Sequence, residues 1–88
     1  MPKHTHIFVE DYDGLVGFGY SREIDESTVK YYLQKFSDDG HASLILGRMS
    51  DQDLESLFNL LGDLMRKYLK EAEYHSHFLK DTDKDDQA

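Results

Sequence analysis

An apolar stripe along the second half of the chain constrains this sequence more than any other feature. From Ser50 to about Leu79 the residue pattern predicts one long helix, with Ser50 as its N-cap. Its apolar positions are Leu54, Leu57, Phe58, Leu60, Leu61, Leu64, Met65, Tyr68, Leu69 and Ala72. At about 100° per residue these positions fill an arc of roughly 180°, against about 100° for an ordinary surface helix. One small sheet cannot cover so wide a face, so the sequence predicts a second partner for it.

The beginning of the chain has the pattern of a β-hairpin. Residues 4–12 and 15–20 are separated by Asp13-Gly14, a dipeptide typical of a two-residue turn between strands. Pairing outward from this turn gives a core face made of Ile7, Val9, Val16, Phe18 and Tyr20. The opposite face then carries His6, Phe8, Glu10, Tyr12 and Leu15.

The remaining elements complete a β-β-α-β-α order. A helix begins at the N-cap Asp25 and ends at Asp38-Asp39-Gly40, and a short apolar third strand follows over Ala42–Leu46. The sequence therefore predicts an α+β fold of two layers, with a small, mostly antiparallel three-stranded sheet. Two helices lie on one face of this sheet, the long C-terminal helix among them, and the second and third strands are open to parallel pairing. We expect a single α+β domain over residues 1–80 and a disordered acidic tail over residues 81–88.

Charge and size narrow the classes of partner. The 88 residues carry a formal net charge of −8, which repels nucleic acid and anionic membranes and suits a basic protein partner. No apolar run approaches the roughly 18 residues of a membrane span, and the absence of cysteine fits a reducing compartment. The sequence thus predicts a cytoplasmic protein, for which oligomerisation is the available reinforcement of a small core.

Histidines are the weak candidates for metal chemistry. In a strand, His4 and His6 project from one face about 7 Å apart, and Glu10 lies on the same face. Zinc usually takes four ligands, so these residues alone do not define a metal site, and no cofactor is assigned. No serine or cysteine lies in the setting of a catalytic nucleophile, and no catalytic residue is identified. The alternative function from this cluster is a small metal-binding protein or an enzyme centred on His6 and Glu10.

Two surfaces are candidates for contacts with other molecules. The first is a flat patch of Phe8, Tyr12 and Leu15, next to the missing side chains of Gly17 and Gly19; filling of that space by Phe8 is the other interpretation. The second is the flank of the long helix made by Leu57, Leu60 and Leu64, with Phe78 further along. The middle of the apolar arc covers the sheet, which leaves this flank for a symmetric helix–helix contact. We therefore expect a small acidic protein that acts by protein–protein contact as a homodimer.

Overall fold

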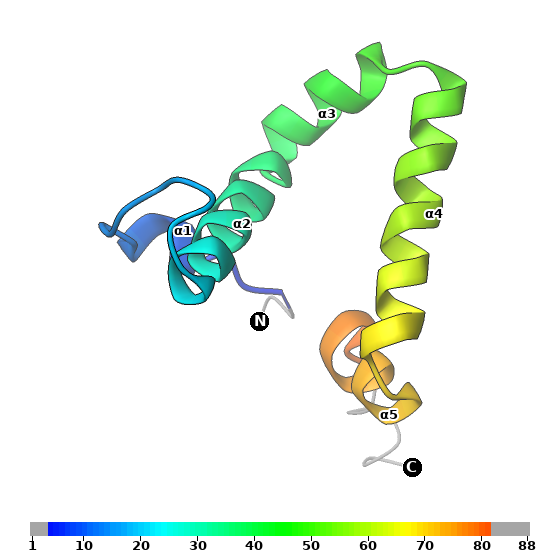
Figure 1. Cartoon of the computed structure of the whole chain (residues 1–88). Coiled ribbons are helices and arrows are strands. Elements are labelled where there is room, and N and C mark those ends of the chain that lie inside the picture. The colour runs from blue at the N-terminus through cyan, green and yellow to red at the C-terminus, as the bar shows by residue number, and fades with distance from the viewer. Residues whose placement is uncertain (1–3, 82–88) are drawn as a thin grey trace. The chain divides into compact units, whose positions relative to one another are not determined.

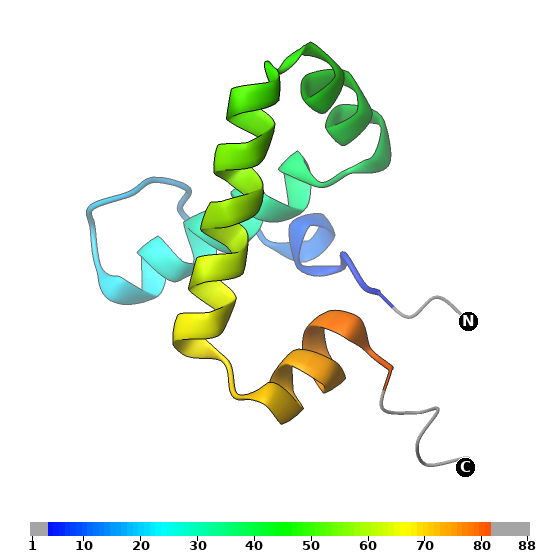
Figure 2. The same ribbon diagram turned by 90° about the vertical axis from the view of Figure 1, so that its right-hand side faces the viewer.

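The residues that the structure describes form helices joined by loops. The computed structural model describes residues 4–81, and Figures 1 and 2 show them from two sides. The elements are α1 (Phe8–Asp11), α2 (Arg22–Phe36), α3 (Asp39–Arg48), α4 (Asp51–Tyr68), α5 (Glu71–Glu73) and a π-helix, η1 (Tyr74–Leu79). Residues 4–81 contain no strand, so the predicted α+β fold with its three-stranded sheet is wrong.

The chain divides into two compact units, and each is described here by itself. The first unit, Met1–Arg48, holds α1, α2 and α3, and the second, Met49–Ala88, holds α4, α5 and η1. The single domain over residues 1–80 stays a prediction. Residues 82–88, which make up most of the predicted acidic tail, lie outside the described residues.

The predicted hairpin is replaced by the single turn of α1 and a loop over residues 12–21. The amide of Asp11 donates to the carbonyl of Ile7 at 3.2 Å, as in a helix. In the loop, the amide of Gly17 donates to Oγ1 of Thr28, and the same hydroxyl donates to the Gly17 carbonyl, both at 3.0 Å. Side chains of α2 thus take up backbone groups for which a hairpin would supply a partner strand.

The predicted core face of that hairpin is also wrong. Ile7, Phe18 and Tyr20 are exposed, Phe18 to 73%, because no sheet covers them. Among residues 4–81, Thr28 is the one buried residue, at 5% exposure, and no apolar side chain is buried. The described chain therefore lacks the apolar core that normally stabilises a domain of this size.

Helix α2 begins earlier than predicted, with Ser21 as its N-cap instead of Asp25. The amide of Ile24 donates to the Ser21 hydroxyl at 3.2 Å. Asp25 instead accepts the amide of Gly19 at 2.7 Å, and Gly19 has a φ of 101°, which favours glycine. Asp25 therefore anchors the loop. The prediction of Asp25 as the N-cap is wrong because serine and aspartate are equally good N-cap residues.

The predicted third strand, Ala42–Leu46, lies inside α3. The Asp38 carboxylate accepts the amide of His41 at 3.2 Å, and the Asp38 carbonyl accepts the amide of Ala42 at 2.7 Å. Asp38 therefore initiates a helix, so that Gly40 falls in its first turn instead of ending the previous one. α3 follows α2 closely, with only Ser37 and Asp38 between them (Figure 1).

Helix α4 begins where the sequence predicts and ends earlier. The Ser50 hydroxyl accepts the amide of Asp53 at 3.1 Å, which confirms the predicted N-cap. The helix continues through Gly62 but stops at Tyr68, because Leu69 and Lys70 are extended. The amide of Lys70 donates to the Glu73 carboxylate at 2.8 Å, and the chain turns sharply into α5 (Figure 2). The expected continuous helix to about Leu79 is therefore wrong beyond Tyr68.

Candidate functional site

A polar pocket in the first unit gathers the residues behind the metal and enzyme hypothesis. Its lining comes from the segment around α1 and from the joint between α2 and α3, and consists of His6, Val9, Glu10, Gln34, Lys35, Ser37, Asp38, Asp39 and His41. His6 and Glu10 both line this pocket, but from a helical turn and the residues before it instead of one face of a strand. The contribution of residues 34–41 was missed, because the sequence shows no link between segments so far apart.

Hydrogen bonds hold the two sides of this pocket together. The amide of Val9 donates to Oε1 of Gln34 at 2.9 Å, and Nε2 of His6 lies 3.0 Å from the Ser37 hydroxyl. Both bonds tie the start of the chain to the last turns of α2. These polar groups of the pocket therefore hold the start of the chain against α2.

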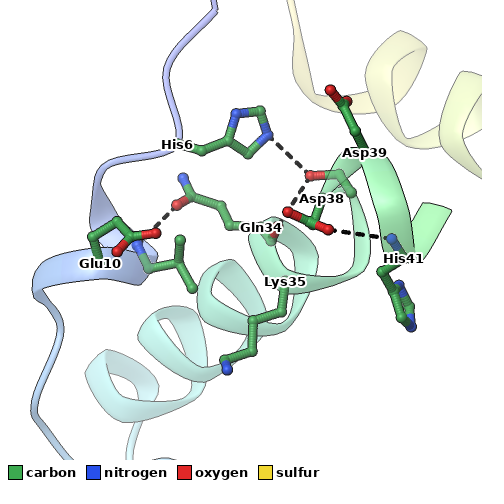
Figure 3. Close-up of a pocket in the computed structure, with 9 residues that line it drawn as sticks. His6, Glu10, Gln34, Lys35, Asp38, Asp39 and His41 are labelled. Carbon is green, nitrogen blue, oxygen red and sulfur yellow. Dashed lines mark hydrogen bonds between the residues drawn. The ribbon is translucent and has the colours of Figure 1, made fainter.

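The candidate ligands in this pocket do not converge. Nδ1 of His41 lies 2.9 Å from the Phe36 carbonyl, and its ring packs edge-on against the Phe36 ring. Figure 3 shows the carboxylates of Glu10 and Asp39 on opposite sides of the pocket. His4 is exposed and does not line the pocket. Within residues 4–81 no three His, Asp or Glu side chains are arranged to hold a metal ion.

The predicted patch of Phe8, Tyr12 and Leu15 exists as a local cluster. The rings of Phe8 and Tyr12 stack with centroids 4.9 Å apart, and the Tyr12 hydroxyl donates to the Leu15 carbonyl at 2.6 Å. Residues i and i+4 share a face in both a strand and a helix, so the pair survives the change of element. Lys30 places its ammonium 4.5 Å from the centre of the Phe8 ring, and Phe8 and Tyr12 are only half-exposed. Phe8 and Tyr12 therefore pack against α2, whereas Leu15 is 50% exposed.

An apolar groove in the second unit lies between α4 and the segment that follows it. It is lined by Phe58, Asn59, Leu61, Gly62, Leu64, Met65, Arg66, Leu69, Glu71, Tyr74 and Phe78. The rings of Tyr74 and Phe78 stack with centroids 5.4 Å apart. The structure places Phe78 on η1, where it lines the groove, and not on a continuation of α4.

The flank predicted as an interface lies along α4, at the margin of this groove. We call Leu57, Leu60 and Leu64 the leucine flank; Leu64 also lines the groove, whereas Leu57 and Leu60 do not. Leu60 is 53% exposed and Leu64 44%, and Leu57 is half-buried. Within the second unit, the segment after Tyr68 faces Leu61, Leu64 and Met65 across the groove, so Leu64 is the residue of the flank that takes part in it.

The comparisons with known proteins give no relatives. No family model, no curated protein and no solved structure matches this chain. None of the helices in residues 4–81 combines the length and the hydropathy needed to cross a membrane.

Proposed function

We propose that this chain is a small acidic cytoplasmic protein that acts by protein–protein contact, as a homodimer formed through the leucine flank of α4. The observation that supports this proposal is the open flank on a helix whose own unit buries no apolar side chain among the described residues. Exposed apolar side chains that follow one helical face are typical of an interaction site.

A second copy of the chain is the occupant that the flank suits best. Leu57, Leu60 and Leu64 are spaced three and four residues apart, so they form one straight row on α4. Two such rows are complementary to each other, as a two-fold interface requires. The chain has no cysteine for a disulfide, and a protein of 88 residues with so little burial gains most from a partner subunit.

The experiment that tests the homodimer compares molar masses in solution. At tens of micromolar, sedimentation velocity or light scattering of the wild type gives the mass of two chains. Leu60→Glu places two like charges near the two-fold axis and gives the mass of one chain, while the helical circular-dichroism signal is largely kept. Asn59→Glu adds the same charge 100° around the helix and leaves the dimer intact.

Either of two results overturns the homodimer. One is a monomeric wild type at tens of micromolar, in which case the leucine flank is covered by the chain itself. The other is a Leu60→Glu protein that stays dimeric, which shows that the subunits meet elsewhere.

The metal or enzyme alternative receives one supporting observation, the meeting of His6 and Glu10 in the same pocket. Because the other candidate ligands of the pocket do not point to one common metal position, this alternative stays second to the homodimer. Titration with zinc, followed through the proton shifts of the histidines, separates the two. Saturable shifts of the His6 ring at equimolar zinc favour the alternative, and unchanged histidine signals count against it.

A further inference from the structure

Two opposite charges lie at the two ends of the leucine flank. Asp53 and Lys67 each lie seven residues from Leu60, on opposite sides of it along α4. Seven residues are about two helical turns, or about 10.5 Å along the axis. Both side chains are exposed. The flank is therefore a row of leucines with a carboxylate at one end and an ammonium at the other.

These charges share the face of the leucines. The order Asp53, Leu57, Leu60, Leu64, Lys67 has spacings of four, three, four and three residues, which keeps all five on one side of a helix. Neither Asp53 nor Lys67 forms an ion pair with another residue among 4–81. The Lys67 ammonium lies 5.3 Å from the centre of the neighbouring Tyr68 ring and stays at the surface.

The charge order distinguishes the two ways in which two copies of α4 can pair. In a parallel pair, Asp53 meets the partner's Asp53 and Lys67 meets the partner's Lys67, so both ends repel. In an antiparallel pair with its two-fold axis near Leu60, Asp53 meets the partner's Lys67 at both ends. The dipoles of the two helices also oppose each other in the antiparallel pair, which favours it further.

We propose that the second copy packs against α4 in the antiparallel direction, with Leu60 near the two-fold axis and Lys67 of the partner subunit beside Asp53. This inference rests on the proposed homodimer and adds its orientation and the charged residues that select it. Opposite charges at both ends favour this orientation over the parallel one, in which like charges meet.

Cross-linking tests the orientation directly, because the chain contains no cysteine and an introduced thiol is unique. Asp53→Cys and Lys67→Cys proteins are prepared separately, the second with a mass tag, and then mixed and treated with a short bismaleimide. The antiparallel dimer gives a cross-linked product that contains one chain of each kind. A parallel dimer gives products within each kind alone, and that result overturns the inference.

Charge reversal gives an independent test. At low salt, Asp53→Lys and Lys67→Asp each raise the dissociation constant of the antiparallel dimer by about tenfold, because an attraction becomes a repulsion at both ends. The double variant Asp53→Lys/Lys67→Asp restores the wild-type value. In a parallel dimer each single variant only exchanges one like-charged pair for another, so unchanged single variants overturn the inference.

Failure of the orientation and failure of the dimer give different results. A wild type that stays monomeric refutes the proposed function and the inference with it. A wild type that is dimeric and is split by Leu60→Glu, but cross-links within each kind of chain, refutes the orientation alone.

Discussion

The hydroxyl of Thr28 makes two hydrogen bonds with the backbone of a single residue, Gly17. It accepts the Gly17 amide and donates to the Gly17 carbonyl, each at 3.0 Å, and Thr28 is the one buried residue among those described. One side chain of α2 thereby replaces both backbone bonds that a neighbouring strand would supply to Gly17. This pairing fixes the loop over residues 12–21 onto α2.

Thr28→Val is therefore expected to destabilise the first unit. Valine has nearly the shape of threonine but leaves both polar groups of Gly17 without a partner, which costs about 1–3 kcal/mol. Denaturant unfolding followed by circular dichroism measures the loss. Thr28→Ser keeps the hydroxyl and is the matched control, with a smaller loss. A Thr28→Val protein as stable as the wild type would show that water satisfies Gly17 equally well.

Removal of the N-cap of α4 is expected to weaken that helix. Ser50→Ala deletes the oxygen that accepts the Asp53 amide, and the loss of such a cap costs about 1 kcal/mol. Thermal melting followed by far-ultraviolet circular dichroism detects the change. Ser50→Asp restores an acceptor and is expected to melt close to the wild type. Equal melting of the alanine and aspartate variants would contradict the role of the cap.

Two glycine-to-alanine substitutions are expected to change the stability of the protein in opposite directions. Gly62 lies inside α4, and a Cβ there would meet only the end of the flexible Arg66 side chain, at 3.4 Å. Gly62→Ala therefore stabilises the helix by up to about 1 kcal/mol. Gly19 has a φ of 101°, so Gly19→Ala strains the backbone and destabilises the loop by about 1–2 kcal/mol. Chemical denaturation of both variants checks the signs, and a destabilised Gly62→Ala protein would contradict this account.

Zinc is expected to leave the melting temperature nearly unchanged. A native-only site filled at a hundred times its dissociation constant adds about 2.7 kcal/mol. For a domain of this size, each 1 kcal/mol raises the melting temperature by about 4–8 °C. Scanning calorimetry at equimolar zinc near neutral pH measures the shift. A rise of more than about 10 °C that disappears in His6→Ala would show that the pocket residues rearrange to bind the metal.

The start of α4 could be predicted from the sequence, because a serine N-cap followed by a long amphipathic pattern has one interpretation. Its end could not. Leu69 and Lys70 are ordinary helix formers, and the bond that holds the break runs from the Lys70 amide to a side chain further along, that of Glu73. Neither glycine nor proline marks the place.

The hairpin and the third strand were mispredicted for a common physical reason. Short apolar runs carry no clear period, so the groups that take up the backbone hydrogen bonds decide between strand and helix. For Gly17 and Gly19 these groups are Thr28 and Asp25, which lie further along the chain. At the start of α3 the deciding group is Asp38. An aspartate before a glycine can end the preceding helix or cap the following one, and the sequence pattern is the same in both cases.

The candidate site was predictable in part. His6 and Glu10 were expected on one face, and they do line one pocket, but Asp38 and His41 reach it only through the folding of α2. The leucine flank was predicted from the spacing of its residues and from a sheet expected to cover the middle of the apolar arc, and residues 4–81 contain no such sheet. The homodimer through this flank stays a prediction.

The attachment of the loop over residues 12–21 by side chains has a consequence for local opening. A strand is held by a ladder in which each backbone bond supports the next, whereas α2 holds this loop through the amides of Gly17 and Gly19 and the carbonyl of Gly17. Detaching the loop breaks few bonds and exposes little apolar surface, so it opens at a lower free energy than the whole unit unfolds. In hydrogen exchange these two amides should therefore exchange together, well before the amides in the middle of α2.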